Sequence, residues 1–221
     1  MRFLFFLFFT AFLSSICIAE EILIYQSFTD KKTVESNWKV QETKEGITME
    51  RTSSDRSSAM LFTNPTYSLE KFQQKDPNKG TDLSATREGS TLSVTGKVKD
   101  DMKTKSYDIG STPWVQEFAF GFKDFLSSND NEYKFEIIHP VDLGLHDMIA
   151  SKEFIEELSI DKKKYTAQKL KITLQGFKKR FWKAEAWYDT QTKQLLRYKA
   201  NEGPGTPTTE TLLINFKQNA S

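Results

Sequence analysis

The sequence contains few reactive side chains. Its 221 residues include one cysteine, Cys17, and two histidines, His139 and His146. The cysteine belongs to the apolar N-terminal segment discussed below. The rest of the chain therefore has no thiol for a disulfide, for a cysteine nucleophile or for a zinc-cysteine site. Imidazole chemistry is confined to the stretch from His139 to Asp147.

Common catalytic motifs are also missing. The sequence has no G-x-S-x-G elbow, no phosphate-binding glycine loop, no G-x-G-x-x-G and no H-E-x-x-H. The adjacent acidic pairs Asp100-Asp101 and Glu156-Glu157 would point to opposite faces of a strand, so neither forms a carboxylate dyad. We therefore expect a protein that is not an enzyme and has no cofactor.

The chain has no excess of charge of either sign. It carries 31 Lys and Arg residues against 30 Asp and Glu residues, and 38% of its residues are hydrophobic. This composition is that of a globular protein, and near-neutrality argues against binding nucleic acid by bulk charge.

The only long apolar run is at the N-terminus. Residues Met1–Ala19 consist of a positive charge at Arg2, a core of Phe and Leu, and small residues at the end. This pattern predicts a secretory signal peptide over 1–19, with 20–221 as a single β-rich domain in the periplasm or outside the cell. A lipid anchor on Cys17 is disfavoured because the β-branched Ile16 precedes it. The run is shorter than the roughly 20 residues of a membrane span, and no later segment suits a transmembrane anchor.

The rest of the chain alternates between apolar and polar residues with a period of two. In Lys169–Gln175, Leu170, Ile172 and Leu174 fall on one face and polar residues on the other, which predicts a half-buried antiparallel strand. The same alternation occurs in many other runs: Trp38/Val40, Ile47/Met49, Tyr67/Leu69, Leu92/Val94, Tyr133/Phe135/Ile137, Phe154–Ile160, Leu196/Tyr198 and Leu212/Ile214/Phe216. Closely spaced strands without intervening helices favour a meandering antiparallel sheet.

One segment breaks this alternation. Thr112 can cap a helix that has Pro113 at its first position, although Gly121 inside it weakens the helix. Aromatic residues then recur at helical spacing: Trp114, Phe118, Phe122 and Phe125. The segment is predicted to form a helix of about three turns with an aromatic stripe. The expected fold is mainly β: a single curved antiparallel sheet, an open or incomplete barrel, covered by one or two short helices.

A candidate ligand site combines this stripe with one face of a later strand. In the run WKAEAWY, that face carries Trp182, Ala184, Ala186 and Tyr188. If it is the concave face of the sheet, the alanines leave room for an apolar ligand beneath the aromatic helix. The alternative is that the stripe completes a solid core and that no cavity exists.

His139, Asp142 and His146 are weak candidates for metal ligands, with Asp147 beside them. Their spacing matches no named ligand signature, and His139 can equally end the strand that contains Phe135. The structural interpretation is favoured, and we expect no metal site.

The chain resembles a family of bacterial periplasmic proteins of unknown function. The resemblance rests on loose aromatic spacings in PWVQ, in FLS, in FEIIHP, in FWKAEAWYD and in LLRY, between Pro113 and Tyr198. These proteins are similar in fold to the carrier and outer-membrane receptor of lipoproteins. The resemblance implies a strongly curved antiparallel sheet, often with an apolar concave face, and implies no catalytic residues.

Two functions follow as hypotheses. The first is a periplasmic protein that binds or carries an apolar ligand, a lipid or acyl chain, in the concave face. The alternative is an interaction or scaffold module with a solid core and a protein partner in the envelope.

Overall fold

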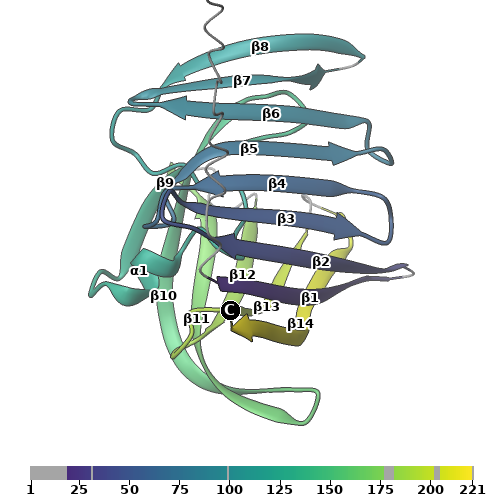
Figure 1. Ribbon diagram of the computed structural model, residues 1–221, viewed down its shortest axis with the longest axis vertical. Coiled ribbons are helices and arrows are strands. Elements are labelled where there is room, and N and C mark those ends of the chain that lie inside the picture. The colour runs from purple at the N-terminus through teal and green to yellow at the C-terminus, as the bar shows by residue number, and fades with distance from the viewer. Residues whose placement is uncertain (1–18, 31, 99, 177–181, 202–204, 221) are drawn as a thin grey trace, which may run out of the picture.

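The structure is a computed structural model that describes residues 19–30, 32–98, 100–176, 182–201 and 205–220 (Figure 1). Cys17 and nearly all of the predicted signal peptide lie outside this part of the chain. The described elements are, in order, β1 (Ala19–Thr29), β2 (Lys32–Glu42), β3 (Ile47–Ser53), β4 (Ser58–Thr63), β5 (Leu69–Asp76), β6 (Thr81–Glu88), β7 (Thr91–Val98), β8 (Asp101–Asp108), α1 (Lys123–Ser127), β9 (Glu132–Ile138), β10 (Leu145–Ile160), β11 (Lys163–Leu174), β12 (Lys183–Asp189), β13 (Leu195–Asn201) and β14 (Thr208–Ala220).

All fourteen strands belong to one sheet, in the order β8-β7-β6-β5-β4-β3-β2-β1-β14-β13-β12-β11-β10-β9. Every neighbouring pair is antiparallel. β1 to β8 are stacked in order with β8 at the top, and β10 to β13 run at a steep angle to them (Figure 1). The sheet curves but does not close, which confirms the predicted fold class.

The alternation in the sequence places one face of each strand in the core. On β2, Ser36, Trp38 and Val40 are buried while the residues between them are exposed. On β11, Leu170 and Ile172 are buried, as the sequence predicted. Apolar side chains from β1 to β8 and from β9 to β14 are buried on the concave face of the sheet. Their burial there stabilises the curved sheet.

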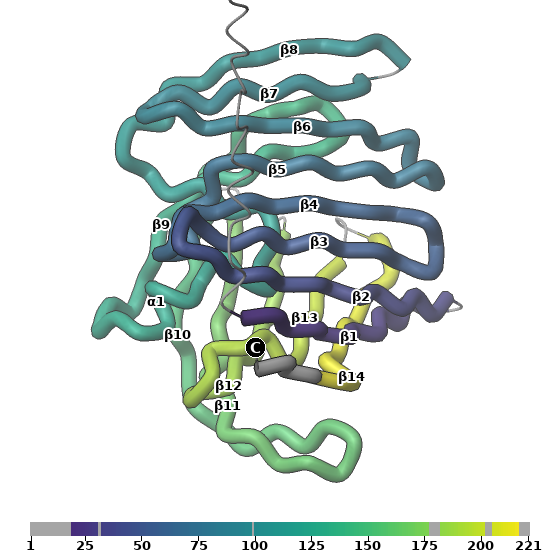
Figure 2. The backbone as a smooth tube through the Cα atoms, viewed as in Figure 1, coloured from purple at the N-terminus to yellow at the C-terminus, as the bar shows by residue number. Residues whose placement is uncertain are grey.

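The β10–β11 hairpin is longer than the strands beside it and projects past them (Figure 2). Its register shifts between Lys152 and Ile155, where one strand carries extra residues. Phe154 and Ile155 lie at this bulge and are exposed, because a bulge rotates side chains off the regular alternation.

The predicted three-turn helix is wrong. Among the described residues of this segment only α1 is helical, and it begins at Lys123, ten residues after Pro113. Residues 113–115 instead pair with β9: the Glu136 N–H donates to the Pro113 carbonyl oxygen at 2.9 Å, and the Val115 N–H donates to the Glu136 carbonyl oxygen at 3.0 Å. These bonds satisfy backbone groups at the sheet edge that a helix would leave unpaired.

Side chains bring the two edges of the sheet together. On β8, the Tyr107 hydroxyl donates to the Leu143 carbonyl oxygen, and Lys105 Nζ donates to the Asp142 carbonyl oxygen at 2.8 Å. Both acceptors belong to the loop that follows β9. The contact joins the edges without a backbone ladder between β8 and β9, so the sheet is an incomplete barrel.

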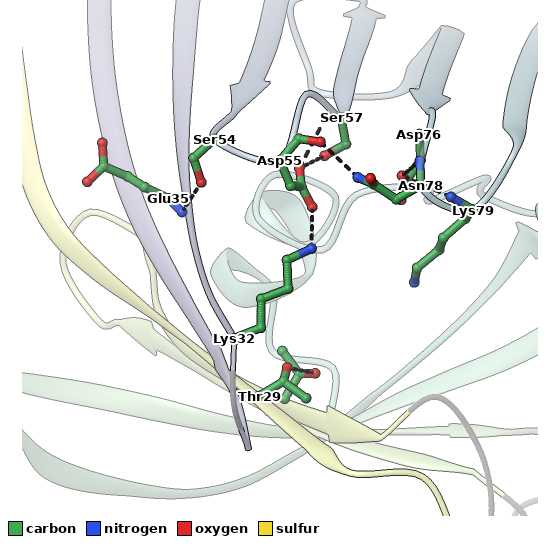
Figure 3. A network of polar contacts seen from close by, with 10 residues as sticks. Thr29, Lys32, Glu35, Ser54, Asp55, Ser57, Asp76, Asn78 and Lys79 are labelled. Carbon is green, nitrogen blue, oxygen red and sulfur yellow. Dashed lines mark hydrogen bonds and ion pairs between the residues drawn. The ribbon is translucent and has the colours of Figure 1, made fainter.

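Polar contacts tie the hairpin turns along one rim of the sheet (Figure 3). The Asp55 carboxylate accepts hydrogen bonds from the Ser57 backbone and hydroxyl and lies 3.4 Å from Lys32 Nζ. Asn78 Nδ2 donates to the Asp55 carbonyl oxygen at 2.8 Å. Partial burial disfavours the ionised Asp55, but the Ser57 hydrogen bonds and Lys32 outweigh it and lower the pKa of Asp55. The rim therefore holds three successive hairpins in place.

Candidate functional site

The segment 114–125, which we call the plug, lies against the concave face of the sheet. Phe122 is the centre of its ring contacts: its centroid is 5.3 Å from that of Phe135 and 6.1 Å from that of Tyr188. Phe125 stacks on Tyr133 at 5.2 Å. Trp114, Phe122 and Phe125 are buried, so the plug forms much of the core between its own segment and β9 to β12.

The predicted β12 face does point inward. Ala184, Ala186 and Tyr188 are buried, and the Tyr188 hydroxyl donates to the Phe118 carbonyl oxygen at 2.9 Å. Trp182 is half-buried and donates from Nε1 to the Asn201 carbonyl oxygen at 2.8 Å. The small alanines thus lie on the same face as the side chains that hold the plug.

A cleft remains on the other side of the plug. It has a volume of about 290 Å³ and lies between the plug and the inward faces of β1 to β3, β13 and β14. Its lining consists of Tyr25, Ser27, Ser36, Trp38, Arg51, Gln116, Glu117, Phe118, Ala119, Leu195, Tyr198 and Thr211. The volume is at the lower end of the range of about 300–1,000 Å³ that is typical of ligand pockets.

Aromatic rings form the walls of the cleft. The Phe118 ring lies 5.8 Å from the Tyr198 ring. Tyr25 is buried and donates its hydroxyl proton to the Leu195 carbonyl oxygen at 3.0 Å. Burial raises the pKa values of Tyr25 and Tyr198, so both phenols stay neutral at physiological pH. These walls suit an apolar molecule.

A charged pair lies in the same cleft. Arg51 Nη1 is 3.8 Å from Glu117 Oε1, and the Arg51 guanidinium lies 5.6 Å from the centroid of the Trp38 ring. Arg51 Nε is buried, and no group in the described part of the chain accepts a hydrogen bond from it. Burial raises the pKa of the Glu117 carboxyl, and Arg51 opposes this only in part. The pair is therefore loosely matched: Nη1 and Oε1 are farther apart than in a direct hydrogen bond, and the Arg51 side chain is 20% exposed.

Of the residues predicted for the ligand site, Phe118, Phe122 and Tyr188 come together at the plug. Phe118 is the one that lines the cleft. Arg51 and Glu117 were not predicted as site residues from the sequence. Arg51 occupies the inward face of β3 after Ile47 and Met49, and a charge that continues an apolar face was a detectable signal. Nothing in the local pattern distinguished Glu117.

The candidate metal ligands also lie close together. One donor atom from each of His139, Asp142 and His146 falls within 4.8 Å of the others, beside the β9–β10 turn and apart from the cleft residues. Asp147 follows His146 on β10 and so points to the opposite face of the strand.

Among the described residues, no helix has the length and apolar character needed to cross a membrane.

Known protein structures include similar folds, whereas sequence comparison finds no match. No protein-family model and no curated protein matches the sequence. Solved structures with a similar fold include a β-barrel-like protein of the domain of unknown function DUF1849 from Brucella abortus, with a TM-score of 0.62, 9% identity, and coverage of 92% of this chain and 99% of that one.

Two further structures match more loosely. The hypothetical lipoprotein YmcC from Escherichia coli has a TM-score of 0.40 at 11% identity and covers 89% of this chain and 84% of its own. The LolA superfamily protein NE2245 from Nitrosomonas europaea has a TM-score of 0.25 at 8% identity, with coverage of 90% and 85%. The chain therefore has the fold of the Brucella barrel-like protein, in line with the resemblance in its sequence.

Proposed function

We propose that this chain is an exported, non-enzymatic protein of the bacterial envelope that binds an apolar ligand, a lipid or acyl chain, in the cleft beside the plug. The single observation that carries the proposal is the composition of the cleft, where aromatic walls surround a partly unmatched Arg51–Glu117 pair.

The cleft suits one type of ligand better than others. Its volume of about 290 Å³ accommodates one acyl chain or a small amphipathic molecule rather than a whole two-chain lipid. The rings of Trp38, Phe118 and Tyr198 contribute apolar surface. The Arg51 guanidinium offers charge-assisted hydrogen bonds to a carboxylate or phosphate. We infer an amphipathic ligand with an acidic head.

The proposed compartment follows from the N-terminal segment. Residues 1–19 have the composition of a cleaved secretory signal, and the chain that follows contains no cysteine that would need reduction. We therefore place the protein in the periplasm.

Ligand binding can be tested by filling the cleft. Ser36 lines the cleft on the inward face of β2, whereas Asn37 lies on the outer face of the same strand. Ser36→Phe should reduce binding of a fluorescent fatty acid at least tenfold, and Asn37→Phe, which adds the same ring outside, should leave it unchanged. Native mass spectrometry of wild-type protein purified from its own periplasm should show adducts of acyl-chain mass. An adduct-free mass together with no uptake of the fatty acid would reject the proposal.

The filled concave face favours a second candidate function. Because the plug occupies the space above Ala184 and Ala186, this part of the interior is solid, as expected of an interaction or scaffold module. This function predicts a specific envelope protein in crosslinked pull-downs, and the same partner should be recovered with Ser36→Phe, which does not alter the outer surface.

A further inference from the structure

The two histidines of the chain meet Asp142 at one end of the β9–β10 hairpin. His139 follows the last residue of β9, and His146 is the second residue of β10. Their ring centroids are 5.4 Å apart, and His139 Nδ1 lies 3.0 Å from Asp142 Oδ1. One donor atom from each of the three side chains falls within 4.8 Å of the others. Residues that are three and four positions apart in the sequence thus bring two imidazoles and one carboxylate close together.

The loop between the strands is built around these side chains. The His139 N–H donates to the Gly144 carbonyl oxygen at 2.8 Å, and the Leu143 N–H donates to the His139 carbonyl oxygen at 2.9 Å. Asp142 Oδ1 accepts the Gly144 N–H at 2.8 Å. A Cβ atom at position 144 would lie only 3.0 Å from Asp142 Oδ1. Glycine at this position therefore lets the carboxylate fold back toward His139.

Contacts with the opposite edge of the sheet hold the loop in place. Leu143 is fully buried and has a positive φ of 56°. A Cβ atom on Gly96 of β7 would lie 2.9 Å from Leu143 Cδ2, so the leucine packs directly on the glycine backbone. Tyr107 and Lys105 donate to the loop carbonyls. Because these anchors already order the loop, a ligand that used the three side chains would lose little conformational entropy on binding.

We propose that His139, Asp142 and His146 bind a divalent transition-metal ion of the zinc class. Imidazole nitrogen and carboxylate oxygen suit zinc, whose bonds to them are about 2.0–2.2 Å long, so that tetrahedral ligand atoms lie roughly 3.4 Å apart. His139 Nδ1 and Asp142 Oδ1 are 3.0 Å apart, a hydrogen-bond distance, so the two atoms need to separate by only about 0.4 Å to bind the same ion. All three side chains are partly or well exposed, so water completes the coordination shell. Nickel and copper prefer the same donors.

A metal at this position stabilises the contact between the two edges of the sheet. It links the end of β9 to the start of β10 through the loop that Tyr107 and Leu143 attach to β7 and β8. An ion that binds only the folded protein stabilises it by mass action. The ammonium of Lys105, held on the Asp142 carbonyl oxygen, works against a dication and keeps the affinity moderate.

Zinc binding is tested on metal-free protein without a polyhistidine tag. Titration with zinc chloride should give one ion per chain, and the temperature of unfolding should rise with zinc. His139→Ala and His146→Ala should each weaken zinc binding at least about tenfold. Losing a residue that only supports a metal ligand already costs this much in known sites. Asp142→Asn should weaken it similarly. Asp147→Asn removes the same charge from the opposite face of β10 and should bind like wild type.

Wild-type protein supplies a test that does not depend on how the variants fold. The chain has only two histidines, so its imidazole NMR signals report on this site alone. Both sets should shift on addition of one equivalent of zinc, and paramagnetic cobalt should broaden signals of the loop that contains Leu143. Shifts in neither histidine, affinity weaker than about 1 mM, or equal binding by the doubly substituted His139→Ala/His146→Ala protein would overturn the proposal.

Discussion

The plug divides the concave face into two regions that differ in their side chains. Toward β9 and β12, the sheet presents the buried residues Phe135, Ala184 and Ala186, and the Phe122 ring of the plug packs against Phe135 with 5.3 Å between centroids. Toward β1 to β3, the inward face carries Ser36 and Arg51, and the cleft remains open. Small apolar residues thus make room for the chain's own aromatic rings, whereas the cleft lies where the inward face carries both aromatic and polar side chains.

The largest effect is expected on the packed side of the plug. Phe122 is almost fully buried and contacts the rings of Phe118, Phe135 and Tyr188. Phe122→Ala should lower the free energy of unfolding by about 3–5 kcal/mol, since it removes a ring and leaves a cavity. Urea denaturation measures this.

The matched variant is Phe118→Ala, which truncates another phenylalanine of the plug, one that lines the cleft. Phe118 is half-buried, so its loss should cost clearly less stability and should change ligand affinity instead. Equal costs for the two substitutions would contradict the division of the concave face into a packed and an open region.

A smaller effect is expected at Gly121. A Cβ atom there would lie 2.3 Å from Val115 Cγ1, so Gly121→Ala should destabilise the protein by about 1–3 kcal/mol through overpacking. In a regular helix the same change would stabilise by roughly 1 kcal/mol. The sign of the change in urea denaturation therefore separates the observed plug from the helix that the sequence predicted. Adding Val115→Ala should restore part of the loss.

The smallest effect is a dependence on pH on the cleft side. Burial raises the pKa of the Glu117 carboxyl above its ordinary value of 4.5, so the folded state binds this proton more tightly than the unfolded state. The wild type should therefore lose stability as the pH rises from about 4.5 through the raised pKa, and this loss should be absent in Glu117→Gln.

The measurement is the difference in unfolding free energy between Glu117→Gln and wild type at several pH values. The difference should grow in favour of the variant across the weakly acidic range and then level off. Glu185 provides the control because the hydrogen bond from Lys169 lowers its pKa. The wild type should therefore lose the stabilisation from Glu185 as the pH falls below about 4.5, and the difference between Glu185→Gln and wild type should change in that range and stay level above it. A difference for Glu117→Gln that does not change with pH would mean that Glu117 is well solvated.

Much of the sheet was predictable from local patterns. Leu170 and Ile172, and Trp38 and Val40, were expected on one face of their strands and are buried there. The inward face of a strand can be predicted from consecutive residues, because side chains alternate between the two faces and each strand buries the same face along its length. The candidate ligand site assumed that Ala184 and Ala186 face inward, and both are buried there, on the side that faces the plug.

The errors arose where distant segments compete for the same backbone. Trp114, Phe118, Phe122 and Phe125 have helical spacing, but residues 113–115 hydrogen-bond to β9, and Gly121 packs on Val115. No local pattern reveals that a sheet edge 20 residues away offers a better set of hydrogen bonds. By contrast, His139, Asp142 and His146, which the sequence offered as weak candidates for metal ligands, do lie close together.

The sequence by itself determined the class of the fold, the inward faces of the strands and the absence of thiol chemistry, because these depend on composition and on alternation between neighbouring residues. Only the tertiary structure decided that the aromatic segment is a plug and that the cleft lies beside Arg51 and Glu117. Each of these features requires curvature that brings together residues far apart in the chain, and curvature arises from the packing of the whole sheet rather than from any one strand.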